Sequence, residues 1–187
     1  ASGWWQTAVS QIEVGTTTNP TISSIAVSGT GVTNGSGDLN AGKAVTLTVT
    51  FSSAVTVNIT GGAPTLTLND GGTATYAGGS GSSALTFSYV VASGQNTSDL
   101  SISSANLNGA TIRDQLGNNA DLSGAANYNP AGILQIDTAT PAAPTALSLD
   151  TTTDSGTKGD GITNATQVKI DGSAEPGSTV TLYDSNG

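Results

Sequence analysis

The densest group of carboxylates in this sequence consists of Asp137, Asp150, Asp154 and Asp160, with only Lys158 among them to offset the charge. Carboxylates gathered in one place repel one another unless a cation lies between them, and hard divalent cations such as Ca²⁺ take oxygen ligands. The chain has no His and no Cys, which argues against Zn²⁺ or Cu²⁺. These four residues are the candidate metal ligands. The alternative is that each Asp only forms a turn or ends a strand, and the spacing of Asp150 and Asp154 does not fit an EF-hand.

The segments that must position these residues have the period of β-strands. In Ala44–Phe51 aliphatic or aromatic residues alternate with Thr, and residues 84–91 repeat the pattern. Such alternation is typical of half-buried antiparallel strands. Asp70-Gly71-Gly72 separates two alternating runs, Pro64–Asn69 and Thr73–Ala77, and predicts a β-hairpin.

Alternation and turn residues predict an all-β chain in three segments. Residues 1–19, which contain Trp4 and Trp5, form the tail or linker of an upstream domain, or else an additional first strand of the next domain. Residues 20–139 form an immunoglobulin-like antiparallel β-sandwich. Further strands are expected near 22–28, 54–59, 99–105, 109–113 and 131–136. Residues 140–187, with strands at Thr145–Leu149, Gln167–Ile170 and Ser178–Tyr183, supply the first half of a second such domain, either truncated or completed by another chain.

Composition excludes several classes of function. The formal charge is −9 with four basic residues, so the chain cannot neutralise many phosphates and we expect no nucleic-acid partner. No apolar run is long enough to span a bilayer, so we expect no membrane insertion. Without His or Cys, acid–base and nucleophilic catalysis are poorly supported, and we expect a protein that is not an enzyme. Asp114-Gln115-Leu116-Gly117-Asn118 indicates a tight turn, with ion binding by Asp114 and Asn118 as the less favoured alternative.

Four runs in the second half of the chain carry a resemblance. They are Ile136-Asp137-Thr138-Ala139-Thr140-Pro141, then Leu149-Asp150-Thr151-Thr152-Thr153-Asp154-Ser155-Gly156 with Gly159-Asp160-Gly161-Ile162-Thr163-Asn164, and finally Gly172-Ser173-Ala174-Glu175-Pro176-Gly177-Ser178-Thr179-Val180-Thr181-Leu182-Tyr183-Asp184. This order resembles the tandem bacterial immunoglobulin-like repeats of giant secreted adhesins and biofilm-associated proteins. Residues 37–43, 64–72 and 106–110 of the first unit resemble such repeats more loosely.

The resemblance implies a structural extender on a bacterial cell surface. Such repeats stack end to end, so neighbouring immunoglobulin-like repeats of the same polypeptide are the implied partners, and other domains would contact host or matrix glycans or proteins. Several such families bind Ca²⁺ at the joints, which assigns Asp137, Asp150, Asp154 and Asp160 as ligands. The chain departs from the repeats at Ser52-Ser53, where an acidic residue is expected, and this weakens any second site that involves Asp38.

Two other functions compete with the extender. The sandwich is alternatively an accessory spacer or carbohydrate-binding module of a secreted enzyme that acts on polysaccharide, with Trp4 and Trp5 as the end of a catalytic domain. The third hypothesis is a sandwich that itself binds a glycan. Aromatic platforms normally mark glycan-binding surfaces, whereas Tyr76, Tyr89, Tyr128 and Tyr183 are scattered along this chain.

Overall fold

The computed structural model describes residues 18–183, which form two compact units divided between Thr138 and Ala139. Unit 1 is the part up to Thr138, and unit 2 begins at Ala139. Each unit is built from β-strands, and the described residues contain no α-helix. The expected N-terminal segment with Trp4 and Trp5 lies outside the described residues.

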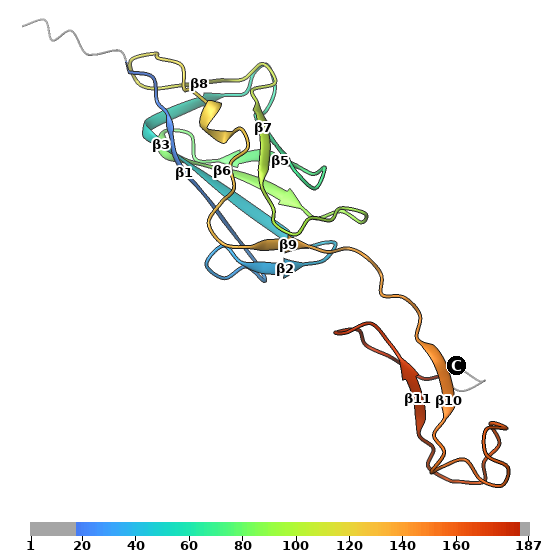
Figure 1. Ribbon diagram of the computed structural model, residues 1–187. Coiled ribbons are helices and arrows are strands. Elements are labelled where there is room, and N and C mark those ends of the chain that lie inside the picture. The colour runs from blue at the N-terminus through green and yellow to red at the C-terminus, as the bar shows by residue number, and fades with distance from the viewer. Residues whose placement is uncertain (1–17, 184–187) are drawn as a thin grey trace, which may run out of the picture. The chain divides into compact units, whose positions relative to one another are not determined.

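Unit 1 is organised around one curled antiparallel sheet (Figure 1). Six strands follow one another across it in the order β1-β3-β6-β5-β4-β7, and β8 pairs with β3 beside this path. Their bounds are β1 Ile22–Gly29, β3 Ala44–Asn58, β4 Thr65–Leu68, β5 Thr73–Gly78, β6 Ser82–Val90, β7 Ile102–Asn106 and β8 Thr111–Arg113. The antiparallel strands expected from alternation at 44–51 and 84–91 are therefore confirmed, as is the hairpin at Asp70–Gly72.

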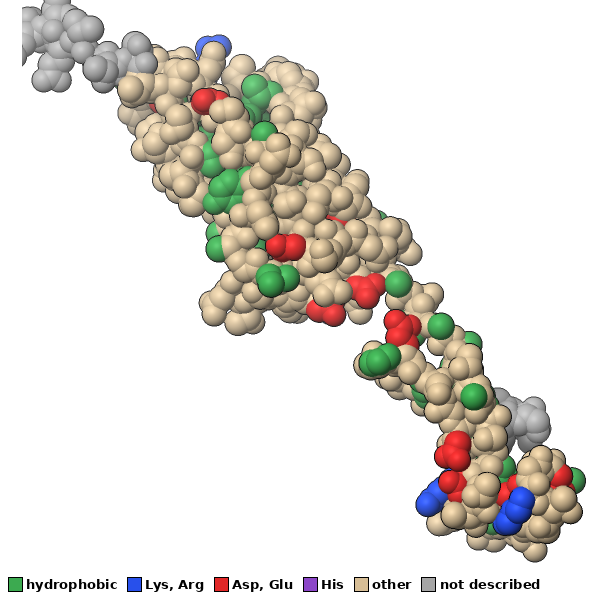
Figure 2. Space-filling view, in the orientation of Figure 1, with side chains coloured by type: hydrophobic (Ala, Val, Ile, Leu, Met, Phe, Trp, Pro, Cys, Tyr) green, Lys and Arg blue, Asp and Glu red, His purple; other side chains and the backbone are tan. Residues whose placement is uncertain are grey.

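The alternation places the apolar residues on one face of the sheet. Val49 pairs with Leu85 and Leu47 with Phe87, and all four side chains are buried. The residues between them are Thr and Ser, as in the neighbouring pair Thr48 and Thr86, and they lie on the opposite face. No charged residue lies on β1, β3, β4, β5, β6 or β7. Figure 2 shows how few acidic or basic side chains unit 1 presents in that view.

Residues 54–59 do not form a separate strand, which corrects the sequence prediction. They continue β3, which runs for 15 residues from Ala44 to Asn58. The pairing with β6 shifts register between Thr50 and Val55, and the last residues of β3 pair with β8 instead. Ser52-Ser53 lies at this irregularity, so the two serines interrupt the alternation without turning the chain.

A second, smaller group of elements covers the apolar face. It contains the short strands β2 (Gly37–Leu39) and β9 (Leu134–Ile136), which pair in parallel, and the 3₁₀ turn η1 (Ser123–Ala125). Leu39, Ala125, Leu134 and Ile136 from these elements belong to the same buried core as the main sheet. The sequence did not predict β2, because three residues show no measurable period.

Unit 2 contains two described strands, β10 (Thr145–Leu149) and β11 (Ile170–Ser173), which pair antiparallel. The strand predicted at Thr145–Leu149 is confirmed. The strand predicted at Gln167–Ile170 begins only at Ile170, and residues 178–183 form no strand although their sequence alternates. Both observed strands are almost fully exposed, so unit 2 buries little apolar surface.

Candidate metal centre

Three of the four candidate ligands lie in one loop of unit 2, residues 150–163, which leaves β10 and leads toward β11. Asp150 is the first residue of this loop and closes its first turn. Its backbone carbonyl accepts the N–H groups of Thr153 and Asp154, each at 2.9 Å. Its carboxylate Oδ1 accepts the N–H of Thr152 at 2.7 Å and also the Thr152 hydroxyl. The side-chain hydrogen bond from Thr152 is the main reason that the pKa of Asp150 lies below its ordinary value.

Asp154 is the one buried charged side chain among the described residues, with 2% of its surface exposed. Oδ2 accepts the N–H of Gly159 at 2.6 Å, whereas Oδ1 is buried and has no hydrogen-bond partner. A buried carboxylate oxygen without a partner is destabilising unless a proton, a water molecule or a cation reaches it. Asp154 therefore has the chemistry of a cation ligand whose second oxygen is available.

Asp160 lies beside Asp154 at a pocket of about 240 Å³. The pocket is lined by Leu147, Ser148, Leu149, Asp154, Gly159, Asp160 and Gly161. Asp160 Oδ1 accepts the N–H of Ile162 at 2.9 Å, which holds the turn that presents the carboxylate. The structure thus brings Asp154 and Asp160 to one pocket, and Asp150 anchors the loop that carries them.

Lys158 does not neutralise these carboxylates directly. Its ammonium group donates to the backbone carbonyl of Asp154 and, at 2.9 Å, to that of Thr151. These bonds go to carbonyl oxygens, so the negative charge of the Asp154 carboxylate has no salt-bridge partner among the interactions of Lys158. The Lys158 ammonium group therefore closes the loop through two backbone carbonyls, and the buried Oδ1 of Asp154 remains without a hydrogen-bond partner.

Asp137 belongs to unit 1, where it directly follows β9. Its backbone N–H donates to the carbonyl of Leu39 at 3.0 Å, which fixes this end of the strand. Within residues 18–183 no group of three or more His, Cys, Asp or Glu side chains is arranged to hold a metal ion. The set of four carboxylates therefore stays a prediction from the sequence, and the pair that the structure itself gathers is Asp154 with Asp160.

Asp114, another carboxylate of unit 1, is already engaged in hydrogen bonds. Asp114 accepts the N–H groups of Leu116 at 2.9 Å and Asn118 at 2.8 Å, and its Oδ2 accepts the Asn118 side-chain amide at 2.9 Å. This confirms the tight turn predicted there. Asp38 lies on β2 opposite Gln135 with its side chain exposed.

A buried polar cluster in unit 1 was missed by sequence reasoning. The Tyr89 hydroxyl lies 2.5 Å from Asp70 Oδ2 and 2.7 Å from Gln95 Oε1, although only 2% of the residue is exposed. Burial, followed by the hydrogen bond to Asp70, raises the pKa of Tyr89 well above its ordinary value. Asp70 Oδ1 also accepts the N–H of Gly72 at 2.8 Å, so the cluster ties the β4–β5 turn to β6. Its only sequence signal was the hairpin residue Asp70.

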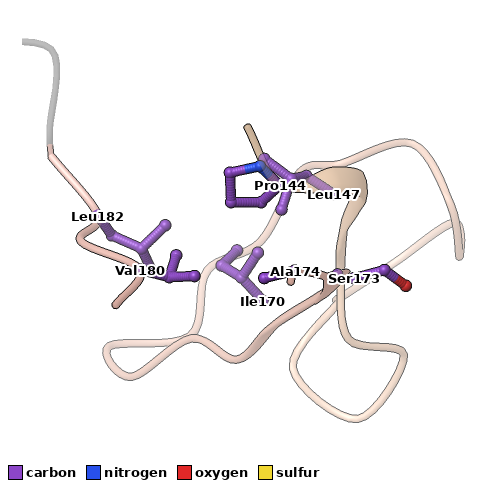
Figure 3. Close-up of a pocket in the computed structure, with 8 residues that line it drawn as sticks. Pro144, Leu147, Ile170, Ser173, Ala174, Val180 and Leu182 are labelled. Atoms are coloured by element: carbon purple, nitrogen blue, oxygen red, sulfur yellow. The ribbon is translucent and has the colours of Figure 1, made fainter. Parts of the chain in front are cut away.

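Unit 2 also has an apolar pocket of about 260 Å³, without acidic or basic side chains. It is lined by Pro144, Leu147, Ile170, Gly172, Ser173, Ala174, Val180 and Leu182. Figure 3 shows Pro144, Ile170 and Val180 around a common space. Because the lining is aliphatic, this pocket has the character of an unfilled core and offers no group for catalysis.

Comparison with protein-family models, with curated proteins and with solved structures gave no match for the chain. Among residues 18–183, no helix is long and apolar enough to cross a bilayer. Residues 18–183 have an all-β architecture, and a loop in unit 2 contains a buried carboxylate oxygen without a hydrogen-bond partner.

Proposed function

We propose that the chain is a structural extender of a bacterial cell-surface adhesin, built from immunoglobulin-like β-sandwich repeats and stiffened by Ca²⁺. The observation that carries the calcium proposal is Asp154 Oδ1, a buried carboxylate oxygen with no partner, in a residue that shares a pocket with Asp160. The all-β fold and the resemblance of residues 20–187 to adhesin repeats support the extender role.

The loop 150–163 supplies the donor chemistry that Ca²⁺ requires. Carboxylate oxygens come from Asp154 and Asp160, and further backbone carbonyls of the same loop would complete a shell of six to eight oxygens. The sequence adds Asp150 and Asp137 as further ligands. A cation bound by Asp154 replaces the missing partner of a buried charge, so binding stabilises the folded loop by mass action.

The proposal places the protein outside the cell, where calcium is in the millimolar range that suits weak extracellular modules. Its partners are neighbouring repeats of the same polypeptide. The mechanism is mechanical: carboxylates that repel one another without a cation are held together when it binds, and the loop next to β10 becomes rigid.

Calorimetric titration of the full chain with Ca²⁺ tests this function. We expect saturable binding in the millimolar range that Asp154→Asn abolishes, because the amide cannot supply the second anionic oxygen. Asp114→Asn is the matched control, since its carboxylate already accepts three hydrogen bonds. Asp137→Asn, Asp150→Asn and Asp160→Asn then show which of the predicted ligands contribute.

Two results would overturn the calcium proposal. One is the absence of both heat and a shift of melting temperature at millimolar Ca²⁺. The other is binding that survives Asp154→Asn unchanged. Parallel titrations with Mg²⁺ and Na⁺ identify the cation, because Mg²⁺ keeps its waters and demands an octahedral site.

A further inference from the structure

The last strand of unit 1, β9, has a position that the spacer role alone does not explain. Residues 134–136 end two positions before Thr138, the last residue of the unit, so β9 is the strand nearest to the point at which the chain leaves unit 1. Among the strand pairs of residues 18–183, β9 with β2 is the one parallel pair. Its register pairs Gly37 with Leu134 and Leu39 with Ile136.

β9 is hydrogen-bonded along both edges. On the side of β2, Gly37 donates its N–H to Ile133 and Asp137 donates to Leu39, each at 3.0 Å. On the other side, Leu100 donates to Leu134 at 2.7 Å, and Ile136 exchanges two bonds with Thr97, each at 2.9 Å. The side chains of Leu134 and Ile136 are each 1% exposed, so the strand is also fixed in the core.

Thr138 extends this attachment to the last residue of the unit. Its N–H donates to Asn96 Oδ1 at 2.8 Å, and its hydroxyl donates to the Gln95 carbonyl at 3.0 Å. The same hydroxyl oxygen accepts the N–H of Gly94 at 2.9 Å. The chain is therefore held by its neighbours until the residue at which it leaves unit 1.

The entry end of unit 1 is tied down as well. Pro20 accepts the N–H of Asp121 and Thr21 accepts the N–H of Ser52, each at 2.8 Å. β1 then pairs with β3 from Ile22 to Gly29. Figure 1 shows the start of β1 and the end of β9 at opposite ends of the unit. Tension between the two ends accordingly pulls β1 from its N-terminal end and β9 from its C-terminal end.

The direction of the pull decides how the hydrogen bonds fail. Bonds between strands run across the strand axis, and in a parallel pair such as β2 with β9 they are slanted but evenly spaced, so a lengthwise pull loads the bonds of β9 together. A pull across the pair opens them one after another from the end. Forced unfolding is governed by the unfolding rate, so bonds that must break together make the stronger resistance.

From this geometry we infer that β9, held between β2 and residues 95–100, is a mechanical clamp through which unit 1 resists tension along the chain. The inference rests on the proposed spacer function, because only a chain loaded at both ends needs such a clamp. It assigns the resistance to unit 1 and makes it independent of the cation loop in unit 2.

Single-molecule force measurements on the full chain test the clamp through the direction of loading. The natural chain has no Cys, so pairs of introduced cysteines define the attachment points without interference. Thr18→Cys with Ala139→Cys pulls β9 lengthwise. Ala41→Cys with Ala139→Cys attaches next to the adjoining C-terminal ends of β2 and β9, and peels the pair apart.

We expect the lengthwise geometry to need a several-fold higher rupture force than the peeling geometry. The lengthwise rupture should release somewhat less than about 40 nm, because residues 20–138 extend to about that length at roughly 3.4 Å each and the folded unit already spans part of it. Equal rupture forces in the two geometries would overturn the clamp, since the same bonds are present in both proteins.

Two variants locate the resistance. Gln135 has an exposed side chain, and Gln135→Pro removes the backbone N–H of this residue. Because the N–H of Ile136 donates to Thr97, the preceding N–H of Gln135 faces β2. Thr138→Val removes the hydroxyl bonds and keeps the shape, with Thr140→Val as control. Gln135→Pro and Thr138→Val should each lower the lengthwise rupture force, whereas Thr140→Val should leave this force unchanged. If Gln135→Pro does not fold, Thr138→Val and the comparison of geometries still decide the matter.

Repeating the measurement with Ca²⁺ and with a chelator separates the two proposals. The clamp predicts the same rupture force for unit 1 in both conditions. Calcium binding with no difference between pulling geometries would overturn the clamp alone. A strong lengthwise resistance in a chain that binds no Ca²⁺ would overturn the calcium site alone.

Discussion

The two units use the same kinds of residues and reach opposite degrees of burial. Leu47 in β3 is 1% exposed, whereas Leu147 in β10 is 57% exposed. Val45 is fully buried in unit 1, while Val180 in unit 2 is 48% exposed. Both units carry alternating aliphatic and Thr residues. The difference is the number of strands, because an alternating strand buries its apolar side only when others cover it.

The hydrogen bonds within turns, in contrast to burial, are alike in the two units. Asp114 in unit 1 and Asp150 in unit 2 each accept the N–H of the residue two positions later, at 2.9 and 2.7 Å. Such turns form from neighbouring residues alone. Turns in this chain are therefore specified locally, whereas burial depends on strands that lie far apart in sequence.

The largest expected effect comes from truncating the matched leucines. Leu47→Ala should cost unit 1 about 2–5 kcal/mol, because it opens a cavity in a packed core. Leu147→Ala should leave the main unfolding transition within about 0.5 kcal/mol of the natural chain, since its side chain is largely exposed. Denaturant unfolding followed by fluorescence or circular dichroism measures both. Similar losses of stability for the two variants would contradict the difference in burial between Leu47 and Leu147.

The next effect concerns the loops that close unit 1. Gly35 has φ +79°, and a Cβ there would lie 2.0 Å from the carbonyl oxygen of Ala131. Gly42 has φ +85° with open space around it. Gly42→Ala should cost about 1–2 kcal/mol from backbone conformation alone, and Gly35→Ala should cost clearly more because the backbone must also move. Thermal unfolding compares the two, and equal costs would mean that the Gly35 turn is not packed against residue 131.

A smaller effect should appear at alkaline pH. Tyr89 keeps its proton in the folded state because its pKa is raised, whereas the unfolded chain loses it near the ordinary value of 10.0. Above that pH the unfolded state binds fewer protons, so the stability of unit 1 should fall as pH rises further. Urea unfolding across this range measures the slope. Tyr89→Phe should flatten it, and an unchanged slope in Tyr89→Phe would refute the assignment.

The smallest effect tests the local turns. Hydrogen bonds from Asn118 and from Thr152 lower the pKa values of Asp114 and Asp150, respectively. The stability that each ionised carboxylate confers is present above its unfolded pKa and is lost as pH falls through the lower folded pKa. In NMR titrations, Asn118→Ala should raise the midpoint of Asp114 only, and Thr152→Ala that of Asp150 only. A change at both positions would contradict local control.

Local patterns account for the parts of the fold that the sequence predicted. Ala44–Phe51 and residues 84–91 alternate over enough residues to reveal a strand, and Asp70-Gly71-Gly72 specifies its turn without outside help. Alternation at 178–183 led to a wrong prediction, because a strand also needs a partner edge. β2 was missed for the opposite reason, since three residues become a strand only by pairing with β9.

The candidate metal site was likewise predicted only as far as local sequence patterns allow. The Asp residues of loop 150–163 were singled out by their density, and the structure places Asp154 and Asp160 at one pocket. The burial of Asp154 and its unpartnered Oδ1 depend on how the loop folds over itself, which spacing does not encode. Tyr89 and Asp70 are distant in sequence, so their cluster could not be read from either motif.

The pairing of β2 with β9 also has a consequence for synthesis. Gly37 leaves the ribosome early, yet its partner Leu134 belongs to the last strand of the unit. The hydrogen bond from the Ile25 N–H to the Tyr128 hydroxyl likewise spans 103 residues. During translation the apolar faces of the first strands stay without the cover of β9, and such states favour aggregation and chaperone binding. The cover that β9 provides for unit 1 can therefore form only after the C-terminal residues of the unit have emerged.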